Sequence, residues 1–226
     1  MHIEPGVVSS TKIILSYATA ASAFGLAGKL ALDSIRQHGG VGRLLARSVI
    51  TTALVLGFFQ FLPHHPVGVS EVHLILGSTL LLIFGAGAAA IGLAAGLLMQ
   101  GMVFAPADLP QYGMNVTTVL VPLWGISHLA NRIVPVGTAY VDLDYRQALS
   151  LSMAYQGGIV AWVAFWVLYG QGFGAATVAS IGTFGLAYMS VVLIEPVIDL
   201  AVLAGAKAGN RLTTGPLFNV RLHQQA

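Results

Sequence analysis

Residues 86–104 read AGAAAIGLAAGLLMQGMVF, an uninterrupted run without a single charged side chain. A helix crosses the hydrocarbon of a bilayer with about 20 mostly apolar residues, and this run has that length and character. The whole chain of 226 residues is 56% hydrophobic and only 8% charged, whereas soluble domains carry about a quarter charged residues. Its mean hydropathy is +0.82. One soluble core of this size cannot bury so much apolar surface, so lipid must cover it. This composition excludes secreted disulfide scaffolds, acidic disordered proteins and nucleic-acid binders.

Further apolar stretches flank this run on both sides. We expect them at residues 7–32, 44–62, 73–84, 114–133, 146–169 and 173–206. Together with residues 86–104 they predict an all-α integral membrane protein, a helical bundle of about seven transmembrane helices. The chain forms a single membrane domain over residues 1–226. The last stretch is interrupted at Glu195-Pro196, where the proline predicts a kink.

The basic residues predict the orientation, because cytoplasmic loops carry an excess of Lys and Arg. With seven alternating spans, all ten Lys and Arg residues except Lys12 fall on one side. This places the N-terminus outside, with residues 63–73 and 105–115 as outer loops. The C-terminal tail, residues 207–226, is then cytoplasmic. We expect a multi-pass protein of the cell inner (plasma) membrane. The first six residues lack the basic segment of a signal peptide, so Met1 is expected to remain as the mature terminus.

Enzyme motifs are missing from the sequence. There is no cysteine, no phosphate loop and no nucleophile elbow, so we expect neither catalysis nor ATP hydrolysis. Histidine is the informative residue type. Four of the seven histidines lie on the predicted outer side, namely His2, His64, His65 and His73. Imidazoles gathered on one side suggest a metal.

His2 has a special property as a second residue. The α-amine of Met1, the backbone nitrogen of His2 and its imidazole can chelate one ion, and a further imidazole would complete a plane of four nitrogens. Such a plane favours Ni(II) or Cu(II) over zinc. The alternative is that His2 is a solvated terminal residue. His73 can likewise be an interfacial histidine bonded to backbone, and Glu71 either orients its ring or faces water. His64 and His65 are expected to be solvated or to collect metal at an entrance.

Several short motifs occur together in the first half of the chain: Met1-His2-Ile3 with Gly6, GVSEVHL at residues 68–74, Gln100, and Gly113-Met114-Asn115. With these motifs the chain resembles the CbiM/NikM-type substrate-binding (S) component of cobalt/nickel energy-coupling factor (ECF) transporters. The resemblance is strongest over residues 1–125. Beyond them it rests on hydropathy and on an acidic residue late in the last span, here Glu195.

The resemblance implies a site and partners. Ni(II) or Co(II) would be the transported substrate, bound through Met1, His2 and His73. The candidate neighbours of the metal are Asn115, which matches a family asparagine, with Glu71 and His65. Members of the family are not enzymes and work with a membrane T component and two cytoplasmic ATPases, and a small accessory membrane subunit is a further candidate partner. The bilayer surrounds the chain, and no nucleic acid is expected.

Two other functions compete with metal capture. One is a haem-binding or other cofactor-binding redox subunit that uses His73 and His128, although the predicted orientation puts these histidines on opposite sides. The other is a structural or regulatory membrane subunit without metal. A Soret band would favour the first, and metal analysis separates the second from metal capture.

A few other polar and small residues also need a role. Glu195 and Asp199 share one helical face, where intramembrane charge is costly. Both are therefore candidates for a functional role. The structural alternatives are a protonated acid bonded to backbone freed by Pro196, or a pair with Lys207 or Arg211, and we favour a structural role for both. Asp142 and Asp144 are expected to cap the following helix. The small residues form two stripes that either pack within the bundle or, on the first span, dock another subunit. They are Ala23, Ala27 and Ala31, and Gly92 with Gly96.

Overall fold

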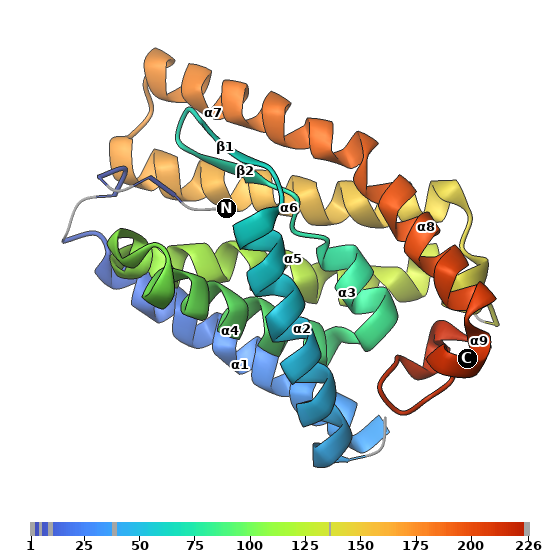
Figure 1. The fold of residues 1–226 in the computed structure, drawn as a ribbon. Helices are drawn as coiled ribbons and strands as arrows, with labels where there is room; N and C mark the ends of the chain where they lie inside the picture. The colour runs from blue at the N-terminus through green and yellow to red at the C-terminus, as the bar shows by residue number, and fades with distance from the viewer. Residues whose placement is uncertain (1–2, 5, 9–10, 38–39, 136, 224–226) are drawn as a thin grey trace.

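The computed structural model describes every residue except 1–2, 5, 9–10, 38–39, 136 and 224–226. Figure 1 shows a bundle of helices with one short β-hairpin. The longer helices are α1 (Ile14–Gln37), α2 (Val41–Phe61), α4 (Ala86–Val103), α5 (Tyr112–Ile133), α6 (Tyr145–Gln171), α7 (Ala175–Met189) and α8 (Glu195–Ala208). The shorter elements are β1 (His64–Val67), β2 (Ser70–His73), α3 (Gly77–Phe84), α9 (Asn210–Thr213) and the 3-10 turns η1 (Pro106–Gln111), η2 (Tyr140–Asp142), η3 (Ser190–Leu193) and η4 (Val220–Leu222).

Four segments of the described chain are long and apolar enough to cross a membrane. They are Val41–Phe61, Ala86–Val103, Tyr145–Gln171 and Ala175–Ala208. Each matches a stretch expected from the sequence to within a few residues. The membrane character is therefore confirmed, while the count of seven spans and the orientation of the termini stay predictions.

The stretch expected as a helix over residues 73–84 is shorter in the structure. Its first residue, His73, ends strand β2, and Leu76 then adopts a left-handed conformation with φ of 55°. The helix begins only at Gly77, so α3 has 8 residues. At 1.5 Å per residue it extends about 12 Å, well short of the hydrocarbon thickness of about 30 Å. Gly85, with φ of 87°, then turns the chain into α4.

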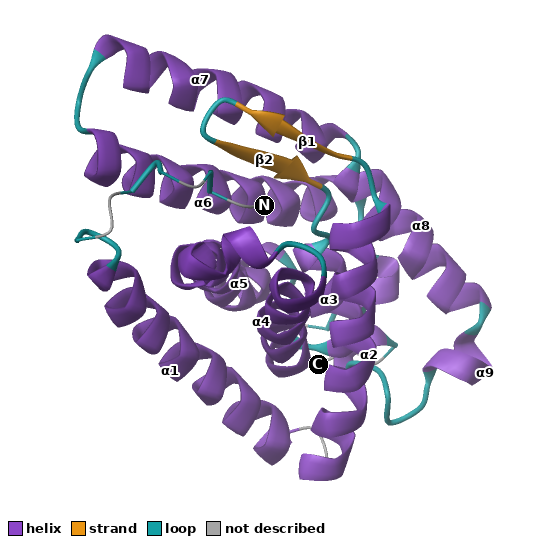
Figure 2. Cartoon of the chain, turned by 60° about the vertical axis from the view of Figure 1, so that its left-hand side comes forward, coloured by secondary structure: helices purple, strands orange, loops and turns teal. Residues whose placement is uncertain are grey.

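The β-hairpin was expected only as a loop. Its strands are antiparallel, with His64 opposite His73 and Val67 opposite Ser70. Figure 2 shows the hairpin beside α7, and the turn residue Gly68 (φ 63°) lies against the carbonyl of Ser180 in that helix. A side chain at Gly68 would meet this carbonyl at 3.0 Å, so the turn needs glycine both for its conformation and for the close approach.

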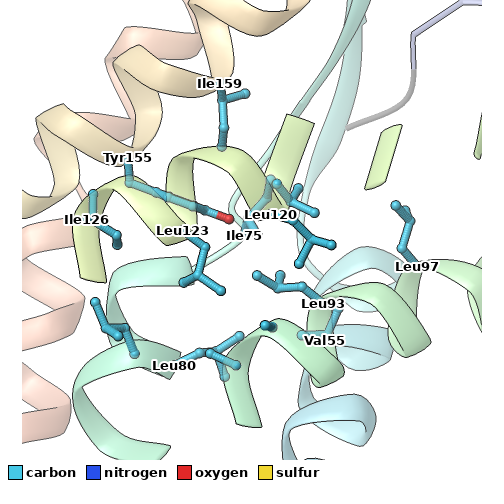
Figure 3. Packing of buried hydrophobic residues seen from close by; sticks show 14 of the residues in the cluster. Val55, Ile75, Leu80, Leu93, Leu97, Leu120, Leu123, Ile126, Tyr155 and Ile159 are labelled. Carbon is cyan, nitrogen blue, oxygen red and sulfur yellow. The ribbon is translucent and has the colours of Figure 1, made fainter. Parts of the chain in front are cut away.

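Small residues let the helices of the core approach closely. A Cβ added to Gly92 would lie 2.3 Å from Thr51 Oγ1, and one added to Gly96 would lie 2.6 Å from Val55. Helix α4 therefore packs tightly on α2 through these glycines. Ala23 and Ala27 of α1 are also buried inside this chain, which favours packing within the bundle for that stripe. Figure 3 shows the apolar core, where side chains from α2, α4, α5 and α6 interdigitate around Leu93, Leu120 and Leu123.

Polar side chains form hydrogen bonds with free backbone groups at both ends of α6. Asp144 forms a capping box with Gln147 at the start of the helix, which confirms its expected role. Asp142 does not cap and instead pairs with Lys207 at 2.6 Å. At the other end Lys12 donates to the carbonyl oxygens of Tyr169 and Gly170. Lys12 is the basic residue that the predicted orientation does not place on the cytoplasmic side. It binds the C-terminal carbonyls of a helix, which is a favourable position for a cation.

The predicted interruption of the last span is confirmed. Helix α7 ends at Met189, a 3-10 turn follows, and α8 begins at Glu195 with Pro196 in its first turn. Proline is tolerated there because the first turn of a helix has no intrahelical acceptor for its N–H. After the kink, α8 packs against α3 and α6.

Candidate metal centre

Ile3 and Glu4 pair with strand β2 and the turn before it. Ile3 forms an antiparallel β-bridge with Ser70, and the N–H of Glu4 donates to the carbonyl of Val69 at 3.3 Å. The side chain of Ile3 is fully buried. Residue 3 is therefore held in an extended conformation beside the hairpin. The predicted ligands Met1 and His2 lie outside the described residues.

Asn115 gives the second anchor of the N-terminal segment. Its Oδ1 accepts the backbone N–H of Ile3 at 2.9 Å. Asn115 is buried in the first turn of α5; the outer loop expected at residues 105–115 is formed here by the 3-10 turn Pro106–Gln111 and the beginning of this helix. Because this asparagine binds the residue that follows His2, its contact is to the segment that would carry the metal ligands.

His73 lies at the end of β2 and is 2% exposed. Its Nε2 is 2.8 Å from Oε2 of Glu71, its ring meets the edge of Phe59, and the ring of His64 stacks on it with 5.0 Å between centroids. A carboxylate that accepts the Nε2 proton fixes the ring and keeps the lone pair on Nδ1, the nitrogen that can then bind a metal. Glu71 thus makes the contact with His73 that was expected of an orienting carboxylate.

The structure places the remaining candidate differently. His65 is exposed and stands opposite Val72 in the hairpin, so it is not brought against His73. His64 stacks on His73 instead; the sequence predicted His64 as solvated or as part of a metal-collecting entrance, without a contact to His73. The signal that could have found it is the antiparallel register, because residues directly opposite in a strand pair lie on the same face.

A small cavity adjoins the same end of the bundle. Its volume is about 10 Å³, and Gln100 of α4, Asp108 of the 3-10 turn and Asn115 of α5 help to line it. This volume is close to the minimum that one water molecule needs. Among the residues that the structure describes, no three His, Asp or Glu side chains gather closely enough to hold a metal by themselves.

A second polar region lies in the interior of the bundle. Glu195 and Asp199 of α8 are fully buried. Oε2 of Glu195 accepts from Ser152 Oγ and Gln156 Nε2, each at 2.5 Å. Ser78 Oγ lies 3.2 Å from Oε1 of Glu195 and 2.8 Å from Oδ2 of Asp199.

Thr79 completes this cluster by bonding Oδ1 of Asp199. Every carboxyl oxygen of the two acids therefore contacts a donor from α3 or α6. Lys207, an expected alternative partner, pairs with Asp142 instead. The structural role that we favoured from the sequence agrees with these contacts.

A comparison with known families decides what kind of protein this is. The sequence model of the cobalt uptake substrate-specific transmembrane region, CbiM, matches residues 2–208. The chain belongs to this family. As a CbiM member it is a transmembrane component of metal uptake, which favours metal transport over the haem-binding and metal-free alternatives.

Solved structures show the same fold. A crystal structure of a transition metal transporter superposes with a TM-score of 0.72 at 18% identity, covering 93% of this chain and 94% of that one. A truncated transition metal transporter gives a TM-score of 0.67 at 19% identity, with 93% and 99% covered. No individual curated protein matches the chain in sequence. The match to the family extends from the N-terminal motif to the end of α8.

Proposed function

We propose that this chain is the metal-capture subunit of an ECF-type transporter for Ni(II) or Co(II). In this proposal the α-amine of Met1, the backbone and imidazole nitrogens of His2, and the imidazole of His73 bind the ion. The ion is the transported substrate. The energy for import comes from a T component and two ATPases on the cytoplasmic side of the plasma membrane, because the chain has no nucleotide-binding motif of its own.

The observation that carries this proposal is the direction of the chain at Ile3. The bridge between Ile3 and Ser70 is antiparallel, so the N-terminal side of Ile3 faces the His73 end of β2. His73 is buried there and oriented by Glu71. Asn115 fixes Ile3 from the other side. The two residues before this anchor span at most about 7 Å, so in this proposal a chelating N-terminus extends along β2 toward His73.

The donor set suggests how the ion is selected. Four nitrogens in a plane suit Ni(II), while a tetrahedral ion such as zinc is disfavoured. Binding requires loss of protons from the amine, the amide and the imidazole, so affinity should fall as the pH is lowered. Nickel and cobalt are separated by direct titration of the same protein with each ion.

The test compares a chain that begins at Met1 with one that carries a single glycine before Met1. Both carry a purification tag at the C-terminus, and metal content is measured after dialysis. We expect one Ni(II) or Co(II) per native chain and loss of retention in the extended chain, with unchanged thermal unfolding of the metal-free proteins. Equal retention by both chains would exclude coordination by the amine.

A further inference from the structure

A basic pocket lies between the beginning of α2 and the segment that follows α9. The C-terminal segment returns toward α2 (Figure 1), and the pocket between them has a volume of about 280 Å³. Arg43 and Arg47 line it from α2, and Phe218, Asn219 and His223 line it from the C-terminal segment. None of the described lining residues is acidic. This pocket has no part in the proposed metal site.

Arg47 is the central residue of the pocket. It is only 4% exposed, and its Nε donates to the carbonyl of Pro216 at 3.0 Å. Its two terminal nitrogens make no hydrogen bond or ion pair with any residue that the structure describes. These nitrogens are not enclosed by protein atoms, so they are open to the pocket and can donate to an acceptor that enters it.

Arg43 makes the charge imbalance larger. It lies one turn before Arg47 and acts on it electrostatically. Like charges four residues apart destabilise a helix, and neither arginine forms an ion pair within the described part of the chain. Both sit in the first two turns of α2, which begins at Val41, where the helix dipole also favours an anion. The pocket is thus a site for a negative charge that the described residues do not supply.

We propose that this pocket binds the phosphate of an anionic phospholipid headgroup. Arginine binds phosphate oxygens through paired N–H donors, and the terminal nitrogens of Arg47 are placed for this contact. Val220 lines the pocket and, like its neighbour Leu217, exposes apolar surface, as expected next to acyl chains. By the predicted orientation this end of α2 faces the cytoplasmic leaflet, which carries anionic lipids.

The first experiment measures lipid binding directly. Full-length protein is placed in nanodiscs of phosphatidylcholine alone or with phosphatidylglycerol, and retained lipids are identified by native mass spectrometry. Thermal unfolding is followed in parallel. We expect one retained phosphatidylglycerol and a higher unfolding midpoint with the anionic lipid. Equal stabilisation by the zwitterionic lipid would overturn the proposal.

Variants then locate the site. Arg43 is exposed, so the Arg43→Gln variant should fold normally. We expect it to retain the lipid about fivefold more weakly, since one arginine near an anionic surface contributes about 1 kcal/mol. Arg47→Gln should weaken retention further. Arg132→Gln removes an exposed arginine from the same predicted side, outside the pocket, and should leave retention unchanged. Retention by Arg43→Gln equal to that of the native chain would contradict the assignment.

A last arm separates lipid from free phosphate. Inorganic phosphate is titrated into phosphatidylcholine nanodiscs against chloride at equal ionic strength. We expect no stabilisation at millimolar phosphate, because the acyl chains contribute to binding of the lipid. Stabilisation by phosphate that disappears in Arg43→Gln would show that a soluble phosphate, rather than a lipid, is the ligand.

Discussion

The core cluster around Glu195 and the hairpin around His73 each bury ionisable side chains, and they do so in different ways. In the core, Glu195 and Asp199 are surrounded by hydroxyl and amide donors from α3 and α6. At the hairpin, His73 is oriented by one carboxylate and packed between aromatic rings. In the core cluster Ser78, Thr79, Ser152 and Gln156 contact the four carboxyl oxygens, with the hydroxyl of Ser78 shared between the two acids, so the acids bond to the protein itself. The hairpin region orients an imidazole, which is what a metal requires.

The largest effect is expected from His73→Ala. Removal of a nitrogen ligand should weaken Ni(II) or Co(II) binding by more than about 100-fold, since loss of a mere supporting contact already costs 10- to 100-fold. Titration calorimetry on protein with a native N-terminus measures this. His65→Ala is the matched control, because His65 is an exposed histidine in the same hairpin. If His73→Ala binds metal normally, the hairpin is a structural element like the core.

Glu195→Ala is expected to lower the stability of the fold and to leave metal affinity unchanged. Ser152 and Gln156 would be left as buried donors without an acceptor, which should lower the free energy of unfolding by about 3 kcal/mol. Thermal or denaturant unfolding in detergent measures the loss. Metal affinity of the folded fraction should stay the same. A selective loss of metal binding without destabilisation would show that the core cluster belongs to the transport site.

Glu71→Gln probes the orientation of His73 with little change in size. The neutral amide holds the ring less firmly, and metal affinity should fall by about 10-fold to 100-fold. Stability of the metal-free protein should change little, because Glu71 is one-quarter exposed. An unchanged affinity would mean that the contact at 2.8 Å only anchors the hairpin.

The smallest effect is expected from Asp144→Ala at the start of α6. The capping box would be lost, and the free energy of unfolding should fall by about 1 kcal/mol. Metal binding should not change. Lys207→Met, which removes an exposed ion pair with Asp142, is the comparison and should cost less. A larger loss for Lys207→Met would contradict this ranking.

The sequence predicted the long helices well, because an apolar run of sufficient length has few alternatives in a membrane protein. Residues 86–104 correspond to α4 almost residue for residue, and residues 44–62 correspond to α2 to within three residues. The Glu195–Asp199 face could be predicted from helical spacing alone. Its partners could not, because Ser78 and Ser152 are far away in the sequence and reach the acids only through packing of α3 and α6.

The hairpin shows why part of the candidate site could not be predicted. Strand β1 is four residues long and contains Pro66, which argues against a strand from sequence alone. The contact of the hairpin with α7 and the bridge from Ser70 of β2 to Ile3 are made by segments that are distant in the sequence. Without the register, His64 and His65 are equivalent neighbours in a loop. Only the pairing of His64 with His73 distinguishes them.

The bond from Ile3 to Asn115 has a consequence for biosynthesis. The two residues are 112 positions apart, so Ile3 cannot take its final place until the start of α5 has been made. The pairing of Ile3 with Ser70 must also wait for the hairpin. If the proposed function holds, the metal site cannot form in a nascent chain before these contacts are made. Capture of an ion would then begin only after more than half of the protein has been synthesised and inserted.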